Sequence, residues 1–254
     1  MSRPFLLVQL SDPHLGASWD GDDPGSRLAA AVDAVLALDP SPDAVLVSGD
    51  LAEHGADEEY AAVRAQLERI DAPLHVLPGN HDDRESLRGA FGLPGDGAEP
   101  VQYAAGLGPL RLVVLDSTLP GEDGGELGSD RLAWLEAQLD AEPETPTVIA
   151  LHHPPLAIGI PAWDAIGLPG PDRAALGEVV ARHPQVRLIV AGHVHRAITG
   201  QLGGRAVLTV PSTYMQGLLR FGSTEILLSD DPPGFAVHAL VDGELVSHVQ
   251  PVRP

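Results

Sequence analysis

The sequence predicts an α/β fold, and three observations support this prediction. Strand-like apolar runs alternate with helix-like segments over most of the chain. The 28 glycines and 24 prolines suit a fold with many short connections between strands and loops. The 254 residues are enough for one large core, and no linker, repeat or low-complexity block interrupts them. We therefore expect one domain over residues 1–254.

Short apolar runs bounded by turn-forming residues predict six strands before the last quarter of the chain. These strands are Phe5–Leu10, Ala44–Ser48, Leu74–Leu77, Leu110–Leu115, Thr147–Leu151 and Arg187–Ala191. Apolar residues at helical spacing, together with acidic or proline-containing starts, predict the helices between them. The helices are Leu28–Leu38, Asp57–Ile70, Ser129–Leu139 and Pro171–Arg182. We expect the glycine-rich segments Gly92–Pro100 and Pro120–Gly128 to be long loops that overhang a site.

After Ala191 the pattern changes to short alternating runs. They are Ala197–Leu202, Ala206–Val210, Glu225–Leu228, Phe235–Leu240 and Leu245–Val249. Two of the pairs are separated by Gly203-Gly204 and Asp242-Gly243, which are typical of hairpin turns. We interpret this part of the chain as antiparallel strands that complete a second sheet.

Composition excludes several classes of function. The chain has no cysteine, so it has no disulfide framework and no thiolate metal site. No apolar stretch approaches the roughly eighteen residues of a membrane span, and the first apolar run is too short for a secretory leader. All fifteen basic residues are arginine and they are scattered, so no basic stripe tracks a nucleic-acid polymer. We expect a cytoplasmic protein without a membrane or nucleic-acid partner, and we interpret the net charge of −21 as a solvated acidic surface.

Five polar clusters, each directly after a predicted strand, point to the chemistry of the chain. They are Asp12-Pro13-His14, Gly49-Asp50, Gly79-Asn80-His81, His152-His153 and Gly192-His193-Val194-His195. In α/β sheets, ligands gather where the carboxyl ends of the strands meet the loops. Carboxylate, amide and imidazole groups together suit two neighbouring metal ions, and a carboxylate such as Asp50 can bridge both because it has two oxygens. A single Asp-x-His pair or a lone histidine would be an ordinary core or surface feature, so the prediction depends on the whole ordered set.

These motifs resemble those of the calcineurin-like metallophosphoesterases over residues 5 to about 217. The runs Gly79-Asn80-His81-Asp82-Asp83-Arg84 and His152-His153-Pro154-Pro155 look more narrowly like class III cyclic-nucleotide phosphodiesterases. The resemblance implies a four-layer αββα sandwich of two mixed β-sheets flanked by helices. It also implies two divalent or mixed-valence metal ions, with Mn, Fe, Zn and Co all compatible with oxygen and nitrogen ligands.

The resemblance assigns a role to each polar residue. It implies that one ion is held by Asp12, His14, Asp50 and His195, and the other by Asp50, Asn80, His152 and His193. His81 would be catalytic and face the substrate phosphate, either stabilising charge on the phosphoryl oxygens or protonating the leaving group. We expect His153 to orient its neighbour His152 rather than to bind metal. Tyr214 is a further candidate for the pocket wall.

The function implied is hydrolysis of small phosphodiesters by in-line attack of a metal-bound hydroxide. Cyclic nucleotides, either 3′,5′-cyclic AMP or 2′,3′-cyclic nucleotides, are the expected substrates. A glycerophosphodiesterase or a broad-specificity phosphoesterase of the same fold is the alternative, and a non-catalytic scaffold is a third, although it would lack ligands that this chain retains. His54 stands where the related serine/threonine phosphatases carry an arginine, which argues against that branch. Related proteins often dimerise, so a homodimer is the oligomer that the resemblance implies.

Overall fold

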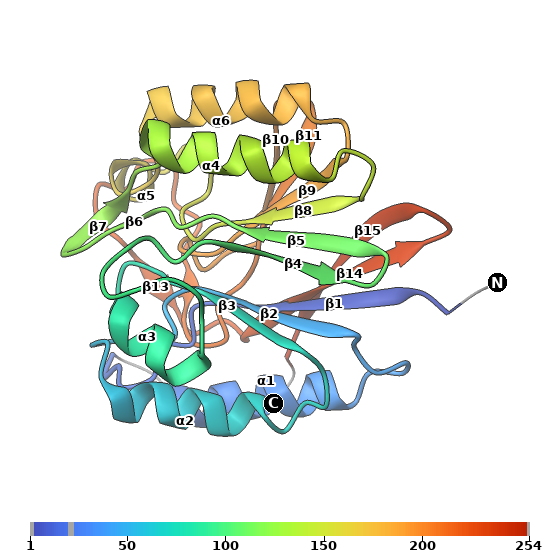
Figure 1. Ribbon diagram of the computed structural model, residues 1–254. Coiled ribbons are helices and arrows are strands. Elements are labelled where there is room, and N and C mark those ends of the chain that lie inside the picture. The colour runs from blue at the N-terminus through green and yellow to red at the C-terminus, as the bar shows by residue number, and fades with distance from the viewer. Residues whose placement is uncertain (1–2, 20–22, 253–254) are drawn as a thin grey trace.

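The computed structural model describes residues 3–19 and 23–252, and two β-sheets packed face to face form its centre (Figure 1). The first sheet has the strand order β15-β14-β1-β2-β3. Its strands are β1 (Phe5–Leu10), β2 (Ala44–Ser48), β3 (Leu74–Leu77), β14 (Gly234–Val241) and β15 (Glu244–Pro251). Strands β1, β2 and β3 run parallel, whereas β14 is antiparallel to both of its neighbours. The sheet is therefore mixed.

The second sheet is also mixed, with the order β10-β11-β9-β8-β5-β4. Its strands are β4 (Tyr103–Leu107), β5 (Leu110–Val114), β8 (Thr147–Ala150), β9 (Val186–Ala191), β10 (Ile198–Leu202) and β11 (Arg205–Thr209). The four central strands are parallel, and antiparallel strands β4 and β10 close the two edges. Two short pairs lie outside both sheets: β6 (Thr118–Leu119) with β7 (Glu122–Gly125), and β12 (Gln216–Gly217) with β13 (Leu228–Ser229).

Helices cover the outer face of each sheet and complete the four predicted layers (Figure 1). The first sheet is covered by α1 (Pro24–Leu36), α2 (Asp57–Leu67) and α3 (Arg84–Phe91), and the second by α4 (Gly128–Ala141) and α6 (Gly170–Arg182). A short helix, α5 (Pro161–Ala165), lies in a loop. Local sequence explains the starts: Asp23 and Asp83 cap α1 and α3 with their side chains, and three acidic residues open α2.

The space between the sheets is filled by apolar side chains from both. Leu7 and Leu46 of the first sheet belong to the same buried cluster as Leu112, Val148 and Val190 of the second. Because successive residues of a strand point to opposite faces, each strand contributes to this inner layer and to an outer layer under the helices. One core thus joins the two sheets, and we propose that residues 1–254 form one domain.

The later strands differ from the sequence interpretation. Strands β10 and β11 join the second sheet, with β11 parallel to β9, but β14 and β15 return to the first sheet. The expectation that all of them complete one sheet is therefore wrong, because alternation identifies a strand without identifying its partner. The predicted strand Glu225–Leu228 is reduced to the two-residue β13. The segment Pro120–Gly128 contains strand β7 and forms a hairpin with β6.

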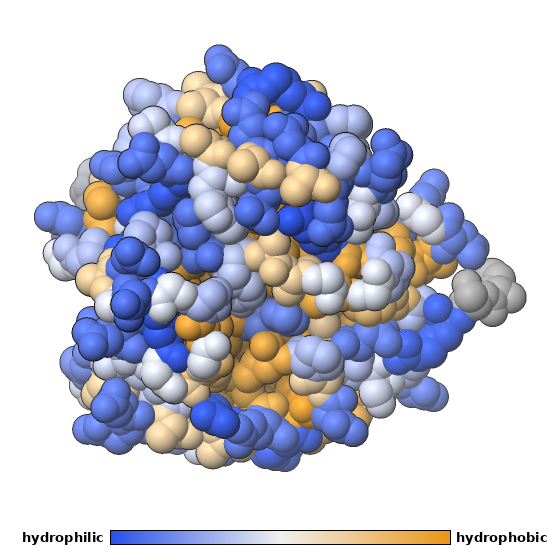
Figure 2. All heavy atoms as spheres, in the orientation of Figure 1, coloured by the Kyte–Doolittle hydropathy of each residue, from blue (hydrophilic) through white to orange (hydrophobic). Residues whose placement is uncertain are grey.

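The visible face of the molecule is mostly hydrophilic, with hydrophobic residues gathered near the lower centre of the view (Figure 2). This distribution agrees with the acidic composition of the chain. In the ranges that the structure describes, no helix combines the length and the apolar character that crossing a membrane requires.

Candidate metal centre

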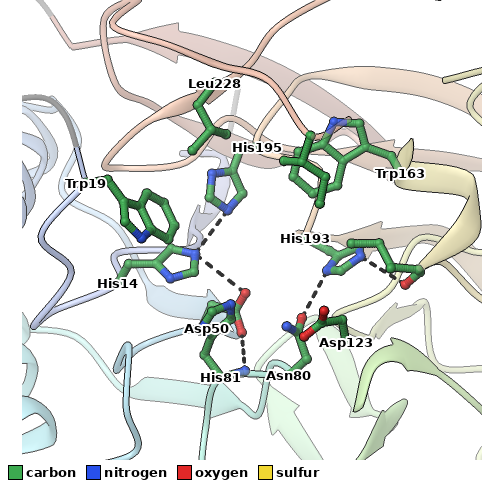
Figure 3. Close-up of a pocket in the computed structure, with 12 residues that line it drawn as sticks. His14, Trp19, Asp50, Asn80, His81, Asp123, Trp163, His193, His195 and Leu228 are labelled. Atoms are coloured by element: carbon green, nitrogen blue, oxygen red, sulfur yellow. Dashed lines mark hydrogen bonds and ion pairs between the residues drawn. The ribbon is translucent and has the colours of Figure 1, made fainter. Parts of the chain in front are cut away.

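The predicted site residues come together at the carboxyl ends of five parallel strands. Asp12 and His14 follow β1, Asp50 follows β2, Asn80 and His81 follow β3, His152 follows β8, and His193 and His195 follow β9. The two sheets present these ends on the same side of the molecule, and most of the residues surround one cavity there (Figure 3). Side chains up to 183 positions apart in sequence thus meet at one place, as the strand-end argument predicts.

The backbone turns sharply at these strand ends. Five predicted ligands have a positive φ, between 47° and 69°: Asp12, His14, Asp50, His193 and His195. Left-handed backbone is uncommon outside glycine and gathers at functional sites, where the surrounding structure holds it. The sixth such non-glycine residue of the described chain is Asp242, in a hairpin turn. Gly79 is required for a different reason: a Cβ there would lie 2.1 Å from Asp50 Oδ1, so only glycine lets the two strand ends approach this closely. Sequence motifs alone did not reveal the left-handed positions.

The first group of side chains is Asp12, His14, Asp50 and His195, all buried. His14 Nε2 lies 3.1 Å from His195 Nε2 and 3.5 Å from Asp50 Oδ2. His195 Nε2 lies 3.6 Å from Asp12 Oδ1, which accepts the His193 backbone N–H at 3.0 Å. Asp12 Oδ2 is buried and has no hydrogen-bond partner in the described part of the chain. A buried carboxylate oxygen without a partner, on an aspartate whose other oxygen lies 3.6 Å from an imidazole nitrogen, fits a divalent cation.

The second group consists of Asn80, His152 and His193, together with the shared Asp50. Asn80 Oδ1 lies 3.1 Å from His152 Nε2 and 3.1 Å from His193 Nδ1. Asp50 Oδ2 lies 3.2 Å from His152 Nε2, so this oxygen is close to a histidine of each group. Its position between the groups is the one that a bridging carboxylate requires. The donor set therefore fits a second ion beside the first.

Hydrogen bonds on the outside of the centre orient the four histidines. In each ring, one nitrogen donates to an oxygen and the other faces the centre, which leaves that second nitrogen for a metal. The donated bonds are His14 Nδ1 to Glu53 Oε2 at 2.8 Å, His152 Nδ1 to Ser48 O at 2.9 Å, His195 Nδ1 to Met215 O at 2.8 Å and His193 Nε2 to Ile166 O at 3.1 Å. The hydrogen bond that orients His152 thus goes to Ser48, and the expectation that His153 performs this role is wrong.

Burial and close charges shift the pKa values of the centre in opposite directions. Burial opposes ionisation of Asp50, but His152 and His14 outweigh it and hold the pKa of this carboxyl well below its usual range. Burial alone would lower the pKa of His152, but the Asp50 carboxylate outweighs burial and raises this pKa to about 9. Burial and the neighbouring imidazoles lower the pKa of His193, and burial lowers that of His195 to about 4. His193 and His195 are therefore neutral at neutral pH, as ligands must be.

His81 lines the cavity beside the two groups. Its backbone N–H donates to Asp50 Oδ1 at 3.0 Å, and its Nδ1 lies 3.1 Å from the carbonyl oxygen of Glu53. Because a carbonyl oxygen only accepts, Nδ1 donates in this contact, and Nε2 is the nitrogen that remains for a substrate. The Glu53 carboxylate also accepts from His14 and from Trp19 Nε1, the latter at 3.2 Å. One glutamate, which the motifs did not single out, therefore contacts a predicted ligand, the predicted catalytic histidine and a wall of the cavity.

His153 is close to His152 and His193 but has no nitrogen available for an ion. Its Nε2 donates to Asp123 O at 3.1 Å, and its Nδ1 accepts from Ser117 Oγ at 2.9 Å. Burial and the charge of His152 lower its pKa to about 3, so the ring is neutral. His153 therefore holds the β6–β7 hairpin in place.

The cavity at the centre has a volume of about 330 Å³ and mostly apolar walls. Besides the predicted residues, its lining contains Trp19, Asp123, Trp163, Ile166, Ile226 and Leu228. Tyr214 does not line it; its buried ring stacks against Trp19 with a centroid distance of 5.3 Å. Sequence reasoning missed these walls, although tryptophan is rare in this chain and Trp19 stands close to His14.

Of the two loops expected to overhang the site, one reaches this cavity. Asp123, from the segment Pro120–Gly128, lines it. From Gly92–Pro100, Ala98 instead lines an adjacent cavity of about 250 Å³, which shares Asn80 and His81 with the first. The overhang is therefore formed by a hairpin on one side of the centre.

Comparison with known proteins also points to a phosphoesterase. The family model "Calcineurin-like phosphoesterase" matches residues 5–197. The chain is 35% identical over 234 residues to the 3′,5′-cyclic adenosine monophosphate phosphodiesterase CpdA of Pseudomonas aeruginosa, covering 91% of this chain and 83% of the relative. It is 33% identical over 252 residues to the glycerophosphodiester phosphodiesterase GpdQ of Enterobacter lignolyticus, covering 96% and 90%. A dimetal phosphatase structure from Danio rerio has the same fold, with a TM-score of 0.73, 18% identity, and coverage of 99% of this chain and 98% of the other.

Proposed function

The chain belongs to the calcineurin-like phosphoesterase family, and we propose that this metal-dependent phosphodiesterase hydrolyses cyclic nucleotides. The proposed substrates are 3′,5′-cyclic AMP and 2′,3′-cyclic nucleotides. The observation that carries the proposal is the convergence of two ligand groups on Asp50, beside a cavity large enough for a small ester. A glycerophosphodiesterase is the second candidate, and the identity to GpdQ over almost the whole chain favours it.

In this proposal the two ligand groups hold two metal ions. Asp12, His14, Asp50 and His195 would hold the first, and Asp50, Asn80, His152 and His193 the second. When bound, the ions supply a water of lowered pKa and positive charge against the phosphoryl oxygens. The oxygen and nitrogen donors suit Mn, Fe, Zn or Co. The outer hydrogen bonds of the histidines keep the ligand nitrogens in place, so little reorganisation accompanies the reaction.

His81 is the proposed catalytic side chain. The hydrogen bond between Nδ1 and Glu53 O holds the ring, and Nε2 would contact the phosphate or the leaving oxygen. There it either stabilises negative charge on the phosphoryl group or gives a proton to the departing alkoxide. The half-exposed position of His81 permits exchange of that proton with water between turnovers.

The cavity walls favour a nucleotide over a glycerol ester. Trp19 and Trp163 stand on opposite sides of His195, with Leu228 between them at the top of the view (Figure 3). Trp19 is held at its indole N–H by Glu53. An aromatic wall gains about 1–3 kcal/mol by stacking on a base, whereas glycerol has no flat apolar surface to offer.

A substrate panel tests the proposal. The protein loaded with Mn²⁺ should hydrolyse bis(p-nitrophenyl) phosphate and lose this activity with a chelator. Its kcat/KM should be highest for 3′,5′-cyclic AMP or 2′,3′-cyclic AMP among these and glycerophosphodiesters. Trp19→Ala should raise KM for the cyclic nucleotide by about tenfold and leave KM for a glycerophosphodiester unchanged. No turnover with Mn²⁺, Fe²⁺, Zn²⁺ or Co²⁺ would favour a non-catalytic scaffold, and a preference for glycerophosphodiesters would favour the second candidate.

We also propose a cytoplasmic enzyme that acts on small molecules, without a nucleic-acid polymer or a membrane as partner. The net charge of −21 and the scattered arginines support this, because an extended polyanion needs a continuous basic surface. The proposed oligomer is a homodimer, and the molar mass in solution tests it.

A further inference from the structure

The β6–β7 hairpin places the carboxylate of Asp123 in the wall of the cavity, which Asp50 also lines. Figure 3 shows Asp123 beside Asn80, on the side of the second ligand group. No hydrogen bond or ion pair joins this carboxylate to another described residue, whereas its backbone carbonyl accepts from His153. The side chain is exposed.

The hairpin that carries Asp123 is held in place by hydrogen bonds to His153. His153 Nε2 holds the carbonyl of Asp123 at 3.1 Å, and Ser117 Oγ bonds both Nδ1 and the backbone N–H of His153. Gly125 packs so closely that a Cβ would lie 2.6 Å from His153 Cγ. A buried histidine, which the proposed reaction does not use, thus anchors the backbone next to Asp123.

The charge of the cavity is unusual for a phosphate site. No arginine belongs to the described lining, although a dianionic phosphate monoester is commonly bound by an arginine fork. Counted with the hydroxide nucleophile, two divalent ions and the carboxylates of Asp12, Asp50 and Asp123 sum to a formal charge of about zero. A diester adds one negative charge to this cavity, whereas a monoester dianion adds two and is repelled more strongly by the Asp123 carboxylate.

We propose that Asp123 is a specificity-determining residue that admits phosphodiester monoanions and repels phosphomonoester dianions. This proposal rests on the proposed function, since it describes how the same cavity selects its substrate. The repulsion also acts on the product, because hydrolysis of a diester converts one negative charge into two. The carboxylate on the hairpin therefore disfavours retention of the monoester that the reaction forms.

The test removes the negative charge of Asp123 while keeping the shape of the side chain. In Mn²⁺-loaded Asp123→Asn, kcat/KM for p-nitrophenyl phosphate relative to bis(p-nitrophenyl) phosphate should rise about fivefold at pH 8, the order that one unit charge gives across a few ångström of wet cleft. Inorganic phosphate should bind about fivefold more tightly by calorimetry. The control is Glu122→Gln, which removes the same charge from the same hairpin outside the cavity lining and should change neither value.

The outcomes separate this inference from the proposed function. An unchanged selectivity and phosphate affinity in Asp123→Asn, or an equal change in Glu122→Gln, would overturn the inference. Loss of metal from Asp123→Asn would also overturn it, because the carboxylate would then be a ligand. If neither protein hydrolyses any diester, the proposed function fails, and the phosphate affinities still decide the role of Asp123.

The anchor is tested in a double-mutant cycle. In the His153→Ala background, with metal content verified, Asp123→Asn should change the selectivity less than twofold, because the hairpin no longer holds the carboxylate at the cavity. A full fivefold effect in that background would show that His153 does not position Asp123.

Discussion

The two ligand groups share Asp50 but differ in charge. The first adds the carboxylate of Asp12, and a further carboxylate, Glu53, bonds to its histidine His14. The second adds the neutral amide of Asn80, and its two histidines donate to backbone carbonyl groups. A cation is attracted more strongly to the first group because more negative charge faces or supports it. We therefore expect a tightly bound first ion and a second ion that is weaker and easier to remove.

The largest expected effect comes from the residue common to both groups. Asp50→Asn should remove both ions and lower kcat on the order of a thousandfold, because each ion contributes several kcal/mol of transition-state stabilisation. Asp12→Asn should remove only the first ion. Metal analysis after gel filtration measures both variants, with the exposed Asp57→Asn as a control that should retain two ions. Retention of the second ion by Asp50→Asn would show that this carboxylate does not bridge the groups.

Asn80→Ala and His81→Ala should separate metal binding from chemistry. Both should lower kcat on the order of a hundredfold, since one removes a ligand of the weaker ion and the other a group that contacts the phosphate. Only Asn80→Ala should lose metal, and excess Mn²⁺ should partly restore its activity. Equal loss of metal in both variants would contradict the substrate-facing role of His81.

Glu53→Gln tests why the first group is expected to bind more tightly. Glutamine keeps the shape of the side chain but loses the negative charge that supports His14. The first ion should bind about 10–100-fold more weakly, the effect that such outer partners of metal ligands have, while the second ion should be little affected. The two dissociation constants follow from Mn²⁺ titration calorimetry. An equal loss of affinity for both ions would show that the charge of Glu53 does not cause the difference in affinity between them.

The second ion should also depend on pH. With the pKa of His152 raised to about 9 by Asp50, this ring is protonated in the metal-free protein at neutral pH and must lose its proton to bind metal. Affinity for the second ion should therefore rise about tenfold per pH unit up to pH 9. The raised pKa of His152 also stabilises the metal-free fold. This stabilisation is fully present below the unfolded pKa of 6.5 and is lost as the pH rises through about 9. Calorimetry at pH 7 and pH 8 measures the affinity, and an unchanged value would contradict the expected charge of His152.

The strand-end motifs made much of the fold predictable, together with the convergence of eight polar residues at one place. Metal ligation restricts residue type strongly, and a parallel sheet places its strand ends on one side, so position along the chain carries spatial information. The later strands were less readable, because alternation in Gly234–Val241 shows that a strand exists but not that it pairs with β1.

The surroundings of the site were not predictable from motifs. Trp19 lies in an irregular segment, Trp163 in the short helix α5 and Leu228 in the two-residue strand β13. The approach of these segments to the cavity depends on the whole fold. Glu53 acts through contacts with three side chains that no spacing rule relates to it. The position of Asp123 in the hairpin depends on its hydrogen bond with His153. The sequence predicted instead that His153 orients its neighbour His152.

The central claim is a pair of ions joined by Asp50, and anomalous scattering from Mn²⁺-loaded crystals tests it directly. Two peaks should appear on either side of the Asp50 carboxylate, one within reach of Asp12, His14 and His195, and the other within reach of Asn80, His152 and His193, with the higher occupancy at the first. A single peak, or two peaks that do not share Asp50, would contradict the account.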